Sequence, residues 1–173
     1  MTLNRDIKDF ALTKQYKEYA LTDIMSGLKS RYAYTIFEAQ QKLGFPSNTL
    51  HLIFLDIDKL KKANDTLGHV AGDEMIIAVS KCIKDAFGDM AECFRMGGDE
   101  FLVTMAAETD IVQERIALFN RLVSQWRGRY VDSLTVSYGI AAANEHPDLN
   151  FEELLKTADY MMYQRKKQQT GCS

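Results

Sequence analysis

Two groups of carboxylates in this chain of 173 residues stand where they could do chemistry. Asp56 and Asp58 end the apolar run HLIFLDID, a pattern typical of a buried central strand whose end meets a site. If the strand persists to its last residue, the two side chains point in the same direction. Asp99 and Glu100 follow a glycine pair between two β-prone runs, which predicts a hairpin with both acids beside its tip.

Carboxylates that converge from different elements can hold hard divalent cations, which prefer oxygen ligands and commonly bridge protein carboxylates to substrate phosphates. Two such cations can clamp the attacking hydroxyl and the leaving pyrophosphate of a phosphoryl transfer. The residues alone leave a plainer interpretation equally open. Asp99 and Glu100 can be turn residues, and Asp56 a strand-end carboxylate with satisfied hydrogen bonds.

The elements that must position these acids can be predicted in order along the chain. Helices are predicted over residues 1–20, 31–43, 110–126 and 150–167, and as two stretches within 59–87. Strands are predicted at 51–58, on both sides of the glycine pair, and at 133–143. Gly68 and Gly72 are predicted to mark turns, and Asp73 to cap the longer helix. The sum is an α+β fold with a βαββαβ core.

Composition excludes several classes of function. Lys and Arg number 21 against 24 Asp and Glu, so the net charge of -3 lacks the field of a nucleic-acid-binding protein. Cys82, Cys93 and Cys172 show neither disulfide nor zinc spacing, which fits a reducing cytosol. No apolar run approaches the roughly 18 residues of a membrane span, and the first residues lack a signal-peptide core. We expect one cytoplasmic domain, on its own or within a larger protein, without nucleic-acid or membrane contact.

Five segments, in order, resemble the GGDEF family of diguanylate cyclases. FRMGGDEF at 94–101 resembles the family's signature segment. The others are DIMSGLKSR at 23–31, LDIDKLKKANDTLGHVAGDE at 55–74, VSYGIA at 136–141 and ADYMMYQRK at 158–166. The resemblance implies a palm-like, ferredoxin-like antiparallel sheet flanked by helices. It also implies an enzyme that condenses two GTP molecules into the signalling nucleotide cyclic di-GMP and releases two pyrophosphates.

The resemblance assigns the acids to metal binding. Asp56, Asp99 and the backbone carbonyl of Ile57 match ligands of two Mg²⁺ ions, for which Mn²⁺ is an alternative, and Glu100 matches a further metal or metal-water partner. Asp99 or its neighbour would also receive the proton of the attacking 3′-hydroxyl. Lys61 matches a lysine near the triphosphate, where a positive charge stabilises the transferring phosphoryl group.

The same resemblance assigns the nucleotide contacts. Asn64 and Asp73 match the pair that reads guanine, because a carboxylate accepts from both donors on an edge that adenine does not offer. The plainer alternatives are a helix cap for Asp73 and a solvated side chain for Asn64. Lys166 matches a phosphate-contacting lysine, although the helix dipole also favours a cation near a C-terminus.

Backbone groups complete the predicted substrate contacts. The peptide N–H groups between Ile57 and Lys61, Leu60 included, are expected to face the phosphates. Gly97 and Gly98 are expected to allow both the hairpin conformation and close approach of the nucleotide.

The chain departs from the family pattern at several positions. Leu60 replaces the usual phenylalanine, an apolar exchange that a core can absorb. Thr170 stands where the family has a second phosphate-binding basic residue, so we expect lower affinity for the triphosphate. Gly88 and Ala91 stand at the arginine and aspartate of the family's inhibitory RxxD site, so feedback inhibition through that site is expected to be absent.

Residues 1–20 are interpreted as a lead-in helix and 21–173 as the GGDEF domain. The motifs hold one GTP per subunit, so the reaction requires a homodimer, and the lead-in resembles connectors to upstream sensory or receiver domains. The main alternative is a regulatory GTP-binding domain without turnover. A cyclic di-GMP receptor is disfavoured by the missing RxxD residues, and an adenine-containing product by Asp73.

Overall fold

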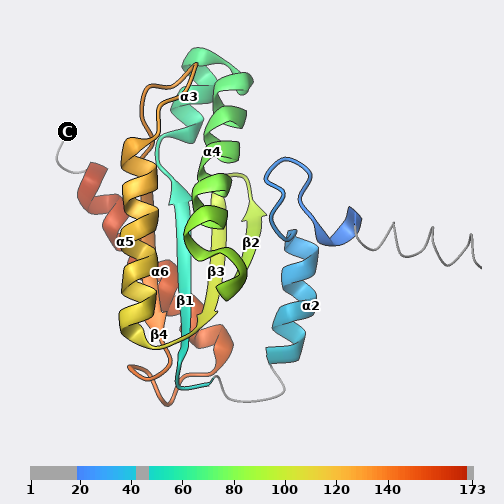
Figure 1. Ribbon diagram of the computed structural model, residues 1–173, viewed down its shortest axis with the longest axis vertical. Coiled ribbons are helices and arrows are strands. Elements are labelled where there is room, and N and C mark those ends of the chain that lie inside the picture. Colours follow the sequence, from blue (N-terminus) through green and yellow to red (C-terminus); the bar gives the residue numbers. More distant parts are fainter. Residues whose placement is uncertain (1–18, 42–46, 171–173) are drawn as a thin grey trace, which may run out of the picture.

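The computed structural model describes residues 19–41 and 47–170 (Figure 1). The predicted helix over 1–20 lies outside this part of the chain except for its end, where residues 19–21 are helical. The named elements are α2 (Arg31–Gln41), β1 (Leu50–Ile57), α3 (Leu60–Leu67), α4 (His69–Phe87), the short 3₁₀ helix η1 (Gly88–Met90), β2 (Glu92–Gly97), β3 (Glu100–Ala106), α5 (Thr109–Gln125), β4 (Val136–Ala142) and α6 (Phe151–Thr170).

The four strands form one sheet in the order β2-β3-β1-β4, and every neighbouring pair is antiparallel. β1 is therefore central, paired with β3 on one side and β4 on the other. The helices α3 and α4 connect β1 to β2, and α5 connects β3 to β4. This connectivity confirms the predicted βαββαβ core and the antiparallel sheet.

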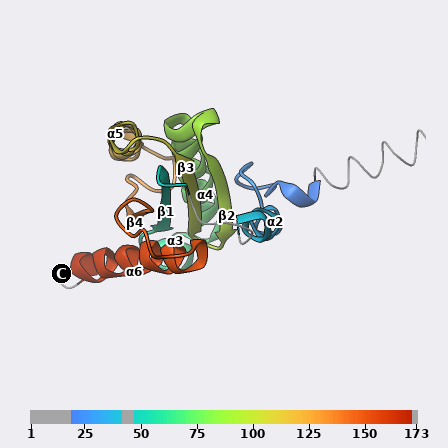
Figure 2. The same ribbon diagram turned by 90° about the horizontal axis from the view of Figure 1, so that it is seen from below.

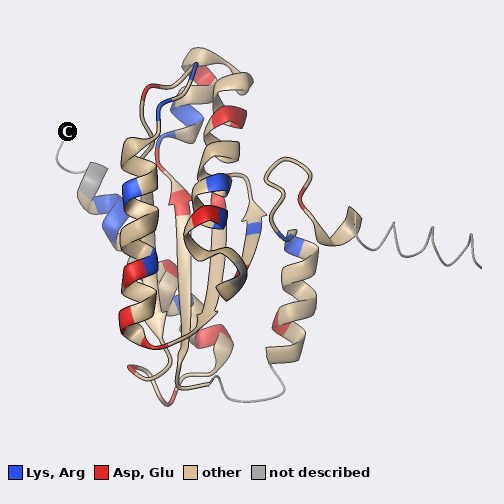
Figure 3. Ribbon diagram, viewed as in Figure 1, with Lys and Arg blue, Asp and Glu red and all other residues tan. Residues whose placement is uncertain are grey.

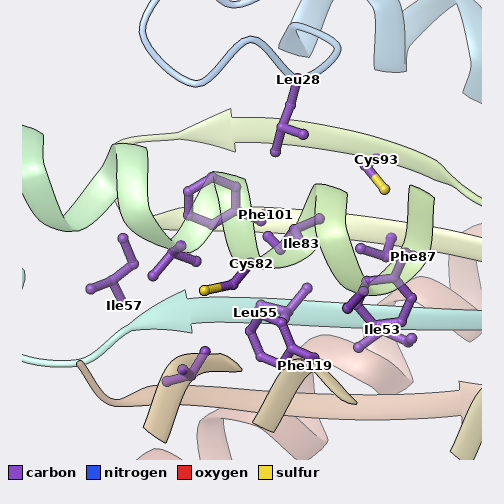
Figure 4. Packing of buried hydrophobic residues seen from close by; sticks show 14 of the residues in the cluster. Leu28, Ile53, Leu55, Ile57, Cys82, Ile83, Phe87, Cys93, Phe101 and Phe119 are labelled. Atoms are coloured by element: carbon purple, nitrogen blue, oxygen red, sulfur yellow. The ribbon is translucent and has the colours of Figure 1, made fainter. Parts of the chain in front are cut away.

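Helices cover both faces of the sheet (Figure 2). On one face, α4 and α5 pack on alternate residues of β1, among them Ile53, Leu55 and Ile57 (Figure 4). On the other face, Leu52 and Phe54 belong to a second cluster, which includes residues of α2 and α6. All residues of β1 are buried. This explains why the strand reads as a nearly continuous apolar run that does not alternate with polar residues.

The predicted turn at Gly72 is wrong. Helix α4 begins at His69 and passes through Gly72, so Asp73 lies inside the helix and caps nothing. The reason is a tertiary contact that local propensity does not reveal. A Cβ at Gly72 would lie 2.0 Å from the side-chain Oδ1 of Asn64, so glycine at residue 72 leaves room for the Asn64 side chain between α3 and α4. Gly68, with φ 86, does separate the two helices as predicted.

Helix α6 lies directly against β4. A Cβ at Gly139 would lie 2.1 Å from the backbone oxygen of Ala158, so the missing side chain sets the distance between the helix and the strand. The helix begins with a reciprocal cap. The Asn150 side chain accepts from the Glu153 N–H, and the Glu153 carboxylate accepts from the Asn150 N–H, both at 3.0 Å. These contacts fix where the last turns of α6 meet the end of the sheet.

The substitution Gly139→Ala should therefore weaken the docking of α6. The added methyl group meets helix backbone, which cannot move without shifting α6, and overpacking of this kind destabilises by about 1–3 kcal/mol. Urea unfolding measures the change. Thr135→Ala, at an exposed position just before the same strand, is the control and should leave stability nearly unchanged. Equal stability of the two variants would contradict the close packing.

Candidate active site

The strand register brings the predicted acids to one end of the sheet. Asp56, the next-to-last residue of β1, lies opposite Glu100, the first residue of β3. The tip of the β2–β3 hairpin is tied to the same place, because the Ile57 N–H donates to the backbone oxygen of Asp99 at 3.0 Å. Figure 3 shows this acidic end of β1 close to basic positions of α3. The convergence expected of the two carboxylate groups is thus present.

An arginine holds the hairpin tip in place. The Arg95 guanidinium donates to the carbonyl of Gly98 from Nε at 3.2 Å and from Nη2 at 2.9 Å. It also forms an ion pair with Asp23 at 3.1 Å. Gly97 and Gly98 have φ values of 148 and 51, as the predicted glycine roles in the hairpin require. Sequence reasoning missed the Arg95–Asp23 pair, although an acid and a base in two separate motifs were a signal for it.

The acids repel one another in a site of low exposure. Burial raises the pKa of Asp56 above its ordinary value, and Asp99 and Asp58 add to the increase, although a hydrogen bond from Lys166 opposes it. Burial likewise raises the pKa of Glu100, with further increases from Asp99 and Asp56. Since ion pairing alone would lower the pKa of Asp56, burial and the neighbouring acids together outweigh the effect of Lys166 on this pKa.

Lys166 approaches the acids from α6, which lies on the face of the sheet opposite to α4 and α5. Its Nζ donates to Oδ1 of Asp56 at 2.5 Å. Burial disfavours the lysine's charge, but the hydrogen bond to Asp56 and the nearby Asp99 and Asp58 outweigh burial and raise the pKa of Lys166. The residue predicted to contact phosphate is therefore next to a residue predicted to bind metal.

Asp58 is a buried carboxylate to which the sequence analysis gave no role in the site. Only 7% of the residue is exposed. Its N–H donates to the Thr135 carbonyl at 3.0 Å, and its Oδ1 accepts from the Ser137 hydroxyl at 2.7 Å. Its other oxygen, Oδ2, is buried and has no hydrogen-bond partner within the described residues. The shared direction of Asp56 and Asp58 along the strand was the signal that could have included it.

These residues suit a hard divalent cation completed by ligands from outside the chain. The donors are carboxylate oxygens, their charge exceeds that of the lysine, and one buried oxygen lacks a partner. Within 19–41 and 47–170, no group of three acidic, histidine or cysteine side chains is arranged so that it could hold a metal ion by itself. Such an open arrangement is usual for Mg²⁺, which keeps several non-protein ligands such as water and substrate phosphates.

The predicted nucleotide contacts lie beyond the end of β1. Asn64 packs against Gly72, so it lies close to Asp73 on the neighbouring helix. The Leu60 side chain is buried, which leaves its backbone as the group that can face a ligand. Lys61 is exposed in the first turn of α3. The turn between β1 and α3 requires Lys59 to adopt a left-handed conformation, with φ 62.

A family model described as "Diguanylate cyclase, GGDEF domain" matches residues 20–172. The chain belongs to the GGDEF domain family. Among curated relatives, diguanylate cyclase DosC of Escherichia coli K12 is 33% identical over 150 residues, which are 81% of this chain and 31% of DosC. Diguanylate cyclase DgcS of Shewanella oneidensis is 32% identical over 172 residues, which are 91% of this chain and 54% of DgcS. This GGDEF domain thus spans only part of the length of these relatives.

Solved structures agree with the family. The GGDEF domain of DgcB from Caulobacter crescentus, crystallised with c-di-GMP, superposes with a TM-score of 0.72 at 27% identity, covering 86% of this chain and 91% of that one. Diguanylate cyclase SiaD from Pseudomonas aeruginosa, solved with its activator SiaC, gives a TM-score of 0.73 at 19% identity, covering 96% of this chain and 70% of that one. The second likeness concerns the fold alone. Both support the palm-like α+β fold of the GGDEF domain.

Replacing Glu100 by glutamine should stabilise the metal-free GGDEF domain at neutral pH. The pKa of Glu100 is raised above 4.5 in the folded chain, so its contribution to stability is complete below pH 4.5 and is lost as pH rises through the folded-state pKa. Glutamine removes that loss. Because solvent screens the partly exposed side chain, we expect Tm at pH 7 in EDTA to rise by only about 2–4 °C.

The advantage of Glu100→Gln should shrink as pH falls towards 4.5, because the native glutamate becomes increasingly protonated. Glu114→Gln, at an exposed position of α5, controls for the loss of one negative charge and should leave Tm nearly unchanged. A Glu100→Gln domain that is less stable than the native one at pH 7 would contradict repulsion among the acids.

Replacing Ser137 by alanine should expose the cost of burying Asp58. The substitution removes the hydroxyl that donates to Asp58 Oδ1, and a buried charged acceptor that loses its donor destabilises by about 1–3 kcal/mol. Chemical denaturation measures this. Ser133→Ala, at an exposed position, should change stability by less than about 0.5 kcal/mol. If the two variants unfold alike, the hydroxyl does not support Asp58.

Proposed function

We propose that this domain is a diguanylate cyclase that condenses two GTP molecules into cyclic di-GMP and releases two pyrophosphates. In each of two steps, a 3′-oxygen forms a bond to the α-phosphorus of the other nucleotide while the bond to pyrophosphate breaks. The main support is the convergence of Asp56, Asp99 and Glu100 at one end of the sheet in a GGDEF domain. The cyclase names of its relatives agree with it.

We assign Asp56, Asp99, Glu100 and the carbonyl of Ile57 to holding two Mg²⁺ ions. When bound, Mg²⁺ would polarise the phosphate and favour ionisation of the 3′-hydroxyl. The carboxylates orient the reacting groups, and Asp99 or its neighbour accepts the proton that leaves the hydroxyl. The repulsion among these acids supports the assignment, because it leaves the site with negative charge that a cation relieves.

Asp73 and Asn64 are proposed to select guanine. A carboxylate on α4 accepts from the two donors of the guanine edge, and an amide on α3 contacts the same base. The close packing of the Asn64 side chain on Gly72 supports this pairing, because Gly72 precedes Asp73 in α4 and Asn64 on α3 therefore lies near Asp73. Adenine would leave the carboxylate without donors, so GTP is preferred over ATP.

Lys61, Lys166 and the backbone of the β1–α3 turn are proposed to hold the phosphates. The exposure of Lys61 leaves its ammonium group accessible to a ligand. The N–H groups after Ile57, including that of Leu60, lead into a helix N-terminus, where anions are favoured. Gly97 and Gly98 let the nucleotide approach the hairpin backbone.

Catalysis is proposed to require a homodimer, because one domain holds one GTP and two nucleotides must react with each other. The chain spans 31% of DosC, so we propose that an upstream sensory or receiver domain controls this pairing. Among the described residues, no helix combines the length and apolar character of a membrane span. We propose that the domain works in the cytoplasm, where GTP is available.

Gly88 and Ala91 stand where the family's product-binding RxxD has its charged residues. We propose that cyclic di-GMP does not inhibit the domain through that site.

Incubation of the domain at high concentration with GTP and Mg²⁺, followed by chromatography of the nucleotides, tests the proposal. A fused dimeric coiled coil removes any limit set by weak pairing. Wild type should form cyclic di-GMP, and Asp99→Ala should lower the rate by about 10²–10⁴-fold, as expected for loss of a group that acts in proton transfer and charge stabilisation. Asp65→Ala, which removes an exposed acid of α3, is the matched control.

The result that contradicts the proposal is a forced dimer that binds GTP without forming product. The domain would then be a regulatory GTP-binding module. Product formation that Asp99→Ala leaves unchanged would instead refute the role given to that carboxylate.

A further inference from the structure

The contact between Lys166 and Asp56 joins two residues with different assigned ligands. Asp56 is assigned to metal and Lys166 to phosphate, yet Lys166 Nζ lies 2.5 Å from Asp56 Oδ1. The Asp56 side chain is 8% exposed and that of Lys166 is 35% exposed. The ammonium group therefore reaches into the site from its edge, and the carboxylate it binds is nearly closed off from water.

We propose that Lys166 is the resident cation of the metal site, which holds Asp56 until a divalent ion replaces it and which then turns to the triphosphate. The inference rests on the proposed function for the identity of the incoming ligands. It gives one lysine two successive partners within a single turnover.

The two cations compete for the same carboxylate. A bound Mg²⁺ lies about 2.0–2.1 Å from its oxygen ligands, and an ammonium 2.5 Å from the same oxygen would lie close to it. Two positive charges at such a separation repel strongly where little water screens them. Asp56 can therefore bind one of them well, and Lys166 has to leave when the metal enters.

Only the side chain has to move. The α6 backbone is fixed against β4 by the close approach of Gly139 to Ala158, whereas a lysine carries its charge on a flexible four-carbon stem. The triphosphate brings negative charge that the displaced ammonium group can bind. Metal and nucleotide thus favour each other's binding, because the nucleotide offers Lys166 a new partner once the metal has taken the first.

The arrangement also keeps the empty site folded. Without a metal, Asp56 repels Asp58, Asp99 and Glu100, and Lys166 offsets part of this repulsion. The consequence is weak binding of a metal that arrives alone, because it must first displace the lysine.

The test compares Lys166→Met with Lys167→Met in two titrations. Lys167 carries the same charge on the next position of α6 but has its ammonium group over the Tyr163 ring, at 4.6 Å. The first titration follows free Mn²⁺ by EPR as the metal alone is added to the domain. The second measures binding of 3′-deoxy-GTP with Mn²⁺, a nucleotide that lacks the attacking hydroxyl and cannot react.

Lys166→Met should change the two affinities in opposite directions. It should bind Mn²⁺ alone about tenfold more tightly, the factor expected when a competing state that holds about nine-tenths of the molecules is removed. It should bind 3′-deoxy-GTP with Mn²⁺ several-fold more weakly, because the phosphate partner is lost. Lys167→Met should change neither by more than about twofold, as expected for exposed charges that salt screens. Lys166→Arg, which keeps the charge, should stay near wild type for Mn²⁺ alone.

Two outcomes overturn the inference: unchanged or weaker Mn²⁺ binding by Lys166→Met, or equal tightening by Lys167→Met, which would indicate a general charge effect. Circular dichroism and thermal unfolding verify that each variant is folded. Neither titration depends on turnover. If wild type forms no cyclic di-GMP but Lys166→Met still shifts the two affinities in opposite directions, the proposed function is refuted and the lysine exchange stands. If wild type forms cyclic di-GMP but Lys166→Met shows no opposed shifts, the proposed function stands and the lysine exchange is refuted.

Discussion

The carboxylate of Asp56 lies at the end of the central strand, where burial and neighbouring acids both oppose its charge. Because β1 is paired on both sides and covered on both faces, solvent can do little to stabilise a charge at this position. Placing acids here costs stability in the empty protein, and a buried charge is tolerated only with a partner. The sheet, the hairpin tip and the last helix are arranged around this excess of negative charge, which also makes the site suitable for a divalent cation.

Rigid contacts fix the layers of the fold, and flexible groups are left to meet the ligand. Gly139 allows β4 and α6 to approach within a distance that a side chain would prevent, so α6 has a defined position on the sheet. Gly72 leaves room for the Asn64 side chain between α3 and α4. Arg95 in turn holds the hairpin tip. Against this frame, Lys61 and Lys166 carry their charges on flexible side chains. Preorganised acids and flexible bases would suit the proposed reaction, which gathers and then releases highly charged nucleotides.

Much of the fold could be predicted from local patterns, but the contacts that complete the site could not. The apolar run ending in Asp56 and the glycine pair before Asp99 are local signals, and both led to the observed elements. The prediction of a turn at Gly72 was wrong because room for a neighbouring side chain can favour glycine as readily as a turn does. The Lys166–Asp56 contact joins residues 110 apart. It depends on how α6 lies across the sheet, which no pattern of either segment specifies.

This separation along the chain has a consequence for biosynthesis. On the ribosome, Asp56 is made well before β4 and α6, so the acids of β1 and the hairpin exist for a time without the lysine that offsets them. Contacts between distant segments also form late in folding, because the intervening loop must first lose its conformational freedom. A nascent chain that stops short of α6 therefore carries the acids of β1 and the hairpin without the ammonium group of Lys166 that offsets part of their charge.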